Sequence, residues 1–421
     1  MPQITARVRA GYAMGSFVTG AFGTVPGLLL LPYLTDSLAV PAAVAGLLVL
    51  APKAWDVLFN PVAGRISDRA GTRRPFLLRG GVAVAVLFAA LFAGPFTGAP
   101  AAVYVAVVFL LCATAYAFFQ VPYVAMAAEI TEDYHERTRL MAWRMAFLAP
   151  AILVSGAGAP VVRDVAGGYW AVGVAVGVLI LAGTLATVAG TRGVPVSRRV
   201  SAAATPRDLV VAVRSRPFRL LLTVFVVQAV GLGTMLAGVD YFARLVLGDE
   251  SLQTLLFVGF VAPALVVMPL WQRVGRRHGK RFGLVAASLL FALAVAGLTA
   301  ARALPVAAVL GLMALIGVGY AGMQVFPLAM LPDVITAQEQ RSGATRAGLF
   351  AGVWTAGETL GLALGPGVYG LVLAIGGYVA STDGSAVQPP GAVPAALIGF
   401  TAIPAVLAVI ALPLLPREET A

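Results

Sequence analysis

Long, nearly uncharged apolar segments follow one another along the whole chain. About 20 apolar residues make one helical crossing of a bilayer. We count twelve such segments, near residues 10–34, 40–63, 76–95, 101–127, 143–162, 168–190, 218–245, 252–272, 282–301, 305–331, 346–376 and 392–415. Lipid offers no partner to free backbone groups, so only helices or closed barrels can span it. Because the segments are continuous, without the ten-residue alternation of a barrel, the sequence predicts an all-α membrane protein.

The composition agrees with this prediction, since 60% of the 421 residues are hydrophobic and 11% are charged. Arg7 and Arg9 precede the first segment as in a signal peptide. That segment continues to Leu31 without a small-residue cleavage site, so we interpret it as the first membrane helix. The single cysteine, Cys112, excludes a disulfide framework.

The distribution of Lys and Arg predicts the orientation. The net charge of +11 could suggest a nucleic-acid partner, but no soluble nucleic-acid-binding module lies between the apolar segments. Twelve spans place both termini on one side. If that side is cytoplasmic, 25 of the 29 Lys and Arg residues fall in cytoplasmic segments. This bias predicts a multi-pass protein of a bacterial plasma (inner) membrane with both termini in the cytoplasm. The Ala-, Val-, Gly- and Arg-rich composition, with only two lysines, is typical of a GC-rich bacterial genome.

The two halves of the chain repeat each other. Gln120-Val121, Met126, Glu129 and Arg137 recur 204 positions later as Gln324-Val325, Met330, Asp333 and Arg341. We therefore expect twelve transmembrane helices in two pseudo-symmetric six-helix bundles, 1–190 and 218–421, joined by a cytoplasmic linker over 191–217. Repeats of this kind place a substrate cavity between the halves and permit alternating access by rocking.

The loop between the second and third segments carries a specific motif. The stretch from Gly64 to Pro75 reads GRISDRAGTRRP and resembles the G-x-x-x-D-R-x-G-R-R loop of the major facilitator superfamily. Gly64 would allow a close helix approach, and the charges would hold a cytoplasmic gate. The predicted gate residues in both halves are Gly64, Asp68, Arg69, Arg73, Arg74, Glu129, Arg137, Asp333 and Arg341.

The second segment indicates a subfamily. The stretch from Lys53 to Gly64, KAWDVLFNPVAG, is similar to the helix 2 signature of the glycoside–pentoside–hexuronide:cation symporters. Further matches, including Pro122-Tyr123 and Gly365-Pro366, extend the resemblance over nearly the whole chain. It implies symport of a sugar-type solute with a cation.

The same resemblance implies that charged positions of the family's sites have changed. The first helix 2 acid is kept as Asp56, but the second falls at Asn60 and the helix 4 acid at Gln120. The helix 1 acid of the sugar site falls near Gly20, and the helix 11 lysine at Thr359. Sodium prefers several oxygen ligands that include anionic ones, so we expect a proton rather than sodium as the coupling ion.

Ionisable groups at membrane depth are costly and mark function by default. Lys53 and Asp56 lie one turn apart and can pair, as a structural ion pair or as part of a coupling site. Glu358 has no cation in the adjacent sequence, so its carboxyl group is a candidate proton carrier, unless it pairs with Arg144 or Lys53. Cation-coupling candidates are therefore Lys53, Asp56, Asn60, Gln120 and Glu358. Near the outer end of the seventh segment, Asp240 and Arg244 form either a self-satisfied pair or an outer gate.

Other residues are candidates for the substrate cavity. Arg144 could reach the cavity or close a gate with Glu129. Trp55 and Trp354 could stack on a sugar ring or serve packing alone. The full set of cavity candidates is Gly20, Trp55, Tyr123, Arg144, Gln324, Trp354 and Thr359.

Several functions remain open at this point. We favour a secondary transporter of a small, sugar-type solute, and expect a monomer, the default for the superfamily, with no cofactor. The alternatives are a carrier of amphipathic or lipid-like molecules, an efflux antiporter, and a non-transporting membrane sensor or assembly factor. The sequence contains no Walker motif, metal-ligand cluster or nucleophile–base pair, which argues against an ATP-driven pump and against an enzyme.

Overall fold

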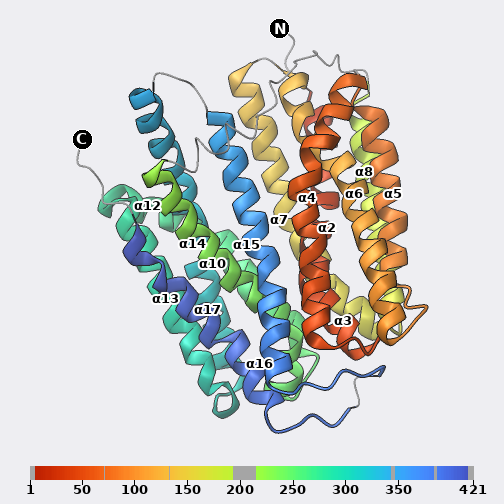
Figure 1. Ribbon diagram of the computed structural model, residues 1–421. Coiled ribbons are helices and arrows are strands. Elements are labelled where there is room, and N and C mark those ends of the chain that lie inside the picture. The colour runs from red at the N-terminus through yellow and green to blue at the C-terminus, as the bar shows by residue number, and fades with distance from the viewer. Residues whose placement is uncertain are drawn as a thin grey trace. The chain divides into compact units, whose positions relative to one another are not determined.

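The computed structural model describes residues 5–70, 72–131, 133–192, 215–342, 347–383 and 386–415, and within these ranges the regular structure is helical (Figure 1). The prediction of an all-α membrane fold is confirmed. Eleven described helices are long and apolar enough to cross a membrane, and one bent helix pair brings the number to twelve. Each apolar segment lies largely in a helix because a long apolar run in lipid can satisfy its backbone only in that way, but the helices over Ala42–Ala70, Tyr134–Val165 and Val306–Ser342 run beyond the predicted segments.

The chain divides into two compact units. The N-terminal unit comprises Met1–Ala203 with Ala380–Ala386, and the C-terminal unit comprises Ala204–Val379 with Val387–Ala421. Most of the predicted linker, 191–217, lies outside the described residues. The segment 380–386 joins the N-terminal unit through backbone bonds: the Ala39 N–H donates to the Ser381 carbonyl oxygen at 2.9 Å, and the Ser381 N–H donates to that of Thr35 at 2.8 Å.

The first span of the N-terminal unit is divided into short pieces, and the other spans are long helices. The pieces are α1 (Ala6–Ala13), α2 (Gly15–Val25), a π-helical turn (Pro26–Leu30) and α3 (Leu31–Asp36). Pro26 and Pro32 lack the N–H that a continuous helix would use, which accounts for the irregular turn between α2 and α3. The long helices are α4 (Ala42–Ala70), α5 (Arg74–Leu91), α6 (Gly98–Ile130), α7 (Tyr134–Val165) and α8 (Tyr169–Gly190).

The C-terminal unit follows the same plan with a bend in its second span. Its helices are α10 (Arg216–Tyr241, continued by a π-helical turn over Phe242–Leu247), α11 (Leu252–Val266), α12 (Met268–His278), α13 (Lys280–Gly297, continued by a 3₁₀ turn over Leu298–Ala303), α14 (Val306–Ser342), α15 (Ala347–Ile375), α16 (Ala392–Phe400) and α17 (Ala402–Ile410, followed by a 3₁₀ turn over Leu412–Leu414). Between α11 and α12 the axis bends by 50°. Pro269 explains the bend, because its ring lacks an N–H and clashes with the carbonyl group one turn earlier.

Large apolar side chains cover the outside of the described helices. Val86, Val178 and Leu293 are 64%, 60% and 72% exposed. Water would penalise so many exposed apolar side chains, whereas lipid does not. The exposed apolar surface therefore agrees with a multi-pass membrane protein.

Glycine permits a close helix contact in the C-terminal unit. Helices α10 and α15 lie side by side (Figure 1) and meet at Gly233 and Gly365. A Cβ atom added at Gly365 would lie 2.1 Å from the backbone carbonyl carbon of Gly233, and one added at Gly233 would lie 2.3 Å from the carbonyl oxygen of Leu362. Small residues at such crossings allow the backbones to pack directly in lipid.

Replacing Gly365 with Ala is expected to destabilise the C-terminal unit. The added methyl group meets backbone, which cannot move aside as a side chain can, and overpacking costs about 1–3 kcal/mol. Gly352→Ala on the same helix is the matched control, because a Cβ atom there meets nothing within 4 Å. The measurement is the apparent melting temperature of the detergent-purified protein. Equal melting temperatures for the two variants would contradict the tight α10–α15 contact.

Candidate functional site

The N-terminal unit contains a buried carboxyl group, that of Asp56, one of whose oxygens has no hydrogen-bond partner among the described residues. Asp56 on α4 is 5% exposed, and its Oδ1 atom has no partner in the described part of the chain. The expected pairing with Lys53 is not formed, since no hydrogen bond or ion pair joins these two described side chains. The Lys53 ammonium instead lies over the ring of Phe22, 4.7 Å from its centre. The cation–π contact occupies Lys53, and Asp56 keeps an oxygen free.

Aromatic packing positions this stretch of α4 against α6. The indole N–H of Trp55 donates to Oγ1 of Thr114 at 3.0 Å, and the Trp55 ring stacks on Phe59 at a centroid distance of 5.6 Å. A tryptophan held in this way is a fixed wall beside Asp56. Its contacts are those of packing, and its proposed role as a sugar platform stays a prediction.

Three further side chains on α4 and α6 bear on this candidate site. Asn60 is half-buried one turn after Asp56 on α4. Gln120 on α6 has a buried Oε1 atom with no hydrogen-bond partner among the described residues. Tyr116, one turn before Gln120, stacks on Phe22 at 3.9 Å. Tyr116 is absent from the sequence-based candidates. It could have been found there, because Tyr320 repeats it at the same offset of 204 that relates Gln120 to Gln324.

A second polar cluster in the N-terminal unit holds Arg144. Tyr12 and Tyr123 stack at 4.7 Å, and each hydroxyl donates to the backbone oxygen of the other residue, at 3.1 and 2.9 Å. The Arg144 guanidinium lies 5.3 Å from the centre of the Tyr123 ring. The hydroxyl of Ser16 donates to the Arg144 backbone oxygen at 2.9 Å. Arg144 is therefore held at the crossing of α2, α6 and α7.

Gly20, the predicted counterpart of a sugar-site acid, lies at a helix contact. A Cβ atom there would come within 2.9 Å of the Ala151 Cβ atom on α7. A side chain at this position would meet α7 directly, so the structure places Gly20 in packing. The expectation that it borders a substrate cavity is not supported by this geometry.

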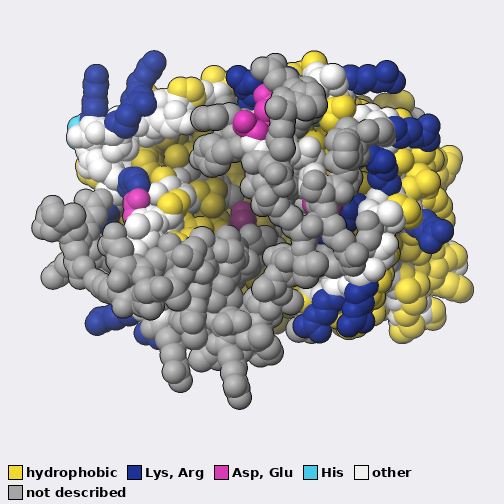
Figure 2. All heavy atoms as spheres, turned by 90° about the horizontal axis from the view of Figure 1, so that it is seen from above, with side chains coloured by type: hydrophobic (Ala, Val, Ile, Leu, Met, Phe, Trp, Pro, Cys, Tyr) yellow, Lys and Arg dark blue, Asp and Glu magenta, His cyan; other side chains and the backbone are white. Residues whose placement is uncertain are grey.

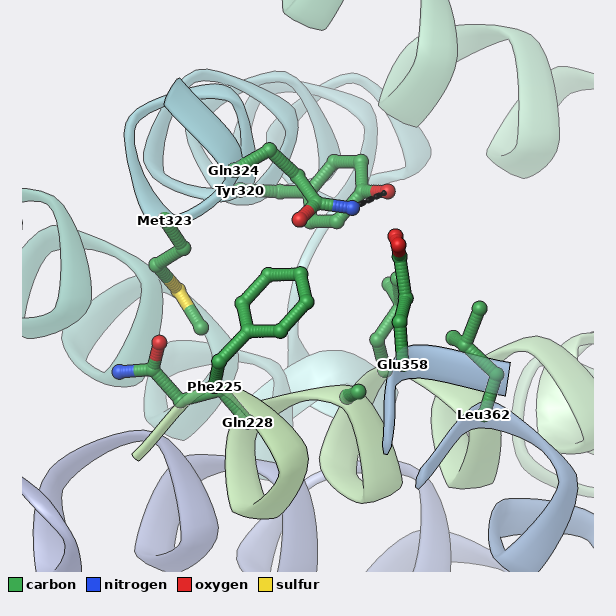
Figure 3. A pocket seen from close by; sticks show the side chains of 9 residues that line it. Phe225, Gln228, Tyr320, Met323, Gln324, Glu358 and Leu362 are labelled. Atoms are coloured by element: carbon green, nitrogen blue, oxygen red, sulfur yellow. Dashed lines mark hydrogen bonds between the residues drawn. The ribbon is translucent and has the colours of Figure 1, made fainter. Parts of the chain in front are cut away.

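The C-terminal unit contains a pocket with Glu358 at its edge. Helices α10, α14 and α15 supply its nine lining residues, and Figure 3 shows three of the polar side chains, those of Tyr320, Gln324 and Glu358, turned toward one another. The Gln324 amide nitrogen donates to the Tyr320 hydroxyl at 2.8 Å, and Gln324 also interacts with the Glu358 carboxyl group. The predicted candidates Gln324 and Glu358, together with the unpredicted Tyr320, thus form one cluster within this unit.

The aromatic wall of this pocket differs from the prediction. Trp354 on α15 is only 2% exposed and stacks on Phe225 of α10 at 4.4 Å. Phe225 lines the pocket, whereas Trp354 is absent from its lining. Trp354 therefore supports Phe225 from behind. Thr359, the position of the family's helix 11 lysine, is half-buried next to Glu358 and also lies outside the lining.

The predicted gate motif is built around a buried ion pair. Arg73 and Glu129 are 8% and 6% exposed, and Arg73 Nη2 lies 2.7 Å from Glu129 Oε1. The Arg73 Nε–H also donates to both carboxylate oxygens, at 3.1 and 3.3 Å, and Nη1 donates to the Ser67 hydroxyl at 2.8 Å. Glu129 therefore pairs with Arg73, and the alternative gate between Glu129 and Arg144 is wrong for this structure.

Gly64 does not serve the close helix approach that its place in the motif suggests. A Cβ atom there would meet only Val121, at 3.5 Å, which is an ordinary contact. Its carbonyl oxygen instead accepts the Ser67 hydroxyl at 2.9 Å. Arg69 is exposed, and Arg74 donates to the Thr191 carbonyl oxygen. The side chains of Asp68, Arg137 and Arg341 lie outside the described residues.

The C-terminal unit has a weaker counterpart of the buried pair. Lys280 Nζ lies 2.5 Å from Asp333 Oδ2, with the side chains 40% and 62% exposed. Asp333 corresponds to Glu129 at the offset of 204, and Lys280 is the first residue of α13 while Arg73 directly precedes α5. The same interaction thus occurs in both units, buried in one and exposed in the other.

The outer pair forms as expected. Asp240 Oδ2 lies 3.7 Å from Arg244 Nη2, and the same guanidinium donates to the Tyr378 hydroxyl at 3.1 Å. The ring of Tyr241 lies 5.7 Å from the Arg244 guanidinium carbon. These contacts match the interpretation of a self-satisfied pair, and the role of an outer gate stays a prediction.

Comparisons with known proteins agree over nearly the full length. The family profile described as "MFS/sugar transport protein" matches residues 11–417. YagG of Escherichia coli (strain K12), provisionally described as a glycoside/cation symporter, is 29% identical over 97% of this chain and 90% of its own. The glucuronide carrier protein homolog of the same organism is 26% identical over 90% of this chain and 86% of its own.

A further sequence relative and a solved structure also match this chain over most of its length. The isoprimeverose transporter of Lactiplantibacillus pentosus is 23% identical over 90% of this chain and 82% of its own. Among solved structures, the nucleoside transporter NupG superimposes with a TM-score of 0.69 at 14% identity, covering 98% of this chain and 100% of that one. At that identity the likeness concerns the fold alone.

Proposed function

Because the chain belongs to the MFS/sugar transport protein family, and is thus a secondary transporter of a small solute rather than an enzyme, we propose that it carries a sugar or glycoside by proton-coupled symport. The observation that carries the coupling is Asp56, a buried carboxyl group with one oxygen free of partners. A carboxylate in apolar surroundings is costly. A bound proton removes that charge and lets the loaded carrier reorient.

The residues at the positions of the family's cation site favour a proton over sodium. Asn60 and Gln120 offer neutral amide oxygens only. The Lys53 ammonium lies on the Phe22 ring and is not paired with the carboxylate. Sodium, as a hard cation, prefers several oxygen ligands including anionic ones. A single carboxylate among amides supports proton binding.

The solute class rests on the relatives. Their printed descriptions name a glycoside, a glucuronide and isoprimeverose. These descriptions belong to those proteins, and for this chain they support a sugar or glycoside as the proposed solute.

For the topology, we propose cytoplasmic termini and a monomer. Figure 2 shows Lys and Arg side chains around the margin of one face, and exposed residues such as Arg65, Arg69, Arg276 and Arg277 lie at the helix ends that the charge bias assigns to the cytoplasm. A cysteine introduced in place of exposed Arg276 should be labelled by an impermeant maleimide only after the cytoplasmic side is opened. Labelling of this cysteine in intact cells would contradict the proposed orientation.

Uptake into proteoliposomes tests the proposed function. Labelled glucose, xylose, 4-nitrophenyl β-glucoside and lysophosphatidylcholine are offered with an inward proton gradient, an inward sodium gradient or neither. We expect at least one sugar or glycoside to accumulate with the proton gradient and not with sodium alone. Accumulation of the lysolipid alone, or dependence on sodium alone, would overturn the proposal.

A further inference from the structure

The pocket of the C-terminal unit brings together groups that complement a hydroxyl. A sugar hydroxyl is both a donor and an acceptor, so it fits a site that offers both. The Glu358 carboxylate accepts, and the Gln324 amide can do either. The Tyr320 hydroxyl accepts from Gln324 at 2.8 Å, which leaves its own O–H free to donate. Figure 3 shows these three side chains turned toward one another.

The rest of the pocket lining is mostly apolar. Phe225 and Met323 line it, and Trp354 stacks behind Phe225 at 4.4 Å and fixes its ring. Gln228 adds an amide oxygen with no partner among the described residues, while its nitrogen donates to Ser288 and to the Ala408 carbonyl oxygen. Ligand sites combine apolar walls with a few placed polar groups in this way.

The ionisable carboxyl and basic groups that line the pocket can give it only negative charge. Glu358 is the only ionisable carboxylate among its described lining residues, and neither Lys nor Arg is among them. A second carboxylate brought close to Glu358 would meet like charge in a poorly screened environment. An ionised Glu358 in this pocket would therefore disfavour an acidic sugar relative to a neutral one.

We propose that this pocket binds hydroxyls of a neutral glycoside, with Glu358 as the acceptor that also excludes uronides. The inference rests on the proposed function and deepens it, because the relatives include both a glucuronide carrier homolog and an isoprimeverose transporter. It also divides the two membrane carboxyl groups between two tasks. Glu358 binds solute, and Asp56 carries the proton.

Exchange in proteoliposomes without any gradient tests this inference, since exchange requires solute binding but not coupling. The probes are two matched pairs: 4-nitrophenyl β-glucoside with the glucuronide, and 4-nitrophenyl β-galactoside with the galacturonide. We expect the neutral member of a pair to exchange and its uronide to be rejected. Glu358→Gln should raise the half-saturating concentration of the neutral glycoside about 10- to 100-fold, the cost of losing a charged hydrogen-bond acceptor. It should also narrow the discrimination against the uronide.

Two further substitutions in the pocket should act in the same direction. Tyr320→Phe and Gln324→Leu each remove hydrogen-bonding atoms that face Glu358, so each should weaken exchange of the neutral glycoside. Glu250→Gln, an exposed carboxylate between α10 and α11, and Gln253→Leu, a buried amide on α11 outside the pocket, are the matched controls. Both controls should exchange as the unaltered protein does.

The outcomes separate this inference from the proposed function. If the neutral glycoside exchanges normally in Glu358→Gln, or if the unaltered protein prefers the uronide, the inference fails and glycoside transport stands. If no glycoside exchanges but glucose or xylose is transported, the inference fails alone, and if no sugar or glycoside is transported at all, both fail. If Glu358→Gln exchanges normally but loses proton-driven accumulation, Glu358 is a coupling carboxyl and the proposed division of tasks is wrong.

Discussion

Replacing Glu129 with Ala is expected to destabilise the protein severely. The substitution leaves the Arg73 guanidinium, which is 8% exposed, without the carboxylate that it contacts at 2.7 Å. Removing one partner of a buried ion pair costs about 3–5 kcal/mol, because the remaining charge is uncompensated. A loss of that size is a large part of the free energy of unfolding of a typical domain. The apparent melting temperature of the detergent-purified protein should fall sharply.

The chain supplies its own control for this result. Asp333→Ala removes the corresponding carboxylate of the C-terminal unit, where the pair with Lys280 is 40% and 62% exposed. Exposed pairs contribute about 0–1 kcal/mol, so this variant should melt close to the unaltered protein. The double variant Arg73→Ala with Glu129→Ala should recover part of the stability lost in Glu129→Ala, since it removes the stranded charge. Similar losses for Glu129→Ala and Asp333→Ala would contradict the assigned burial.

Asp56→Asn is expected to abolish proton-driven accumulation while solute exchange continues. The amide has nearly the shape of the carboxyl group but cannot bind and release a proton. A one-unit pH gradient stores about 1.4 kcal/mol per proton, enough for about tenfold accumulation of a neutral solute. In the variant, the internal concentration should rise only to the external one. The measurement is uptake of the transported glycoside by proteoliposomes at a fixed pH gradient.

Two comparisons make this expectation specific. Asp240→Asn changes another buried aspartate on a membrane helix, but one that is already 3.7 Å from Arg244, so it should keep accumulation. Unequal exchange by Asp56→Asn and the unaltered protein would point to a role of Asp56 in solute binding. Full accumulation by Asp56→Asn would refute the assignment of Asp56 as the coupling carboxyl.

The internal repeat also relates two residues that are absent from the sequence-based candidates. The offset of 204 that joins Gln120 to Gln324 also joins Tyr116 to Tyr320, and both tyrosines contact the candidate sites. Spacing along a helix is enough to associate each tyrosine with the glutamine four residues later, because residues four apart share one face of a helix. The partners from other helices could not be found in this way. Lys53 contacts Phe22, and Trp354 contacts Phe225. In both cases the partner is distant in the sequence.

The sequence by itself determined the membrane fold, its helical ranges and its family, because long apolar runs in lipid have only one way to satisfy their backbone and the motif spacings are local. Only the tertiary structure decided the partners of the charged residues. Lys53 can reach Asp56 along the helix yet lies on Phe22, and Glu129 pairs with Arg73 and not with Arg144. The physical reason is that a buried charge is stabilised by whichever groups packing brings within a few ångströms, and helix crossings, which sequence separation does not encode, set those distances.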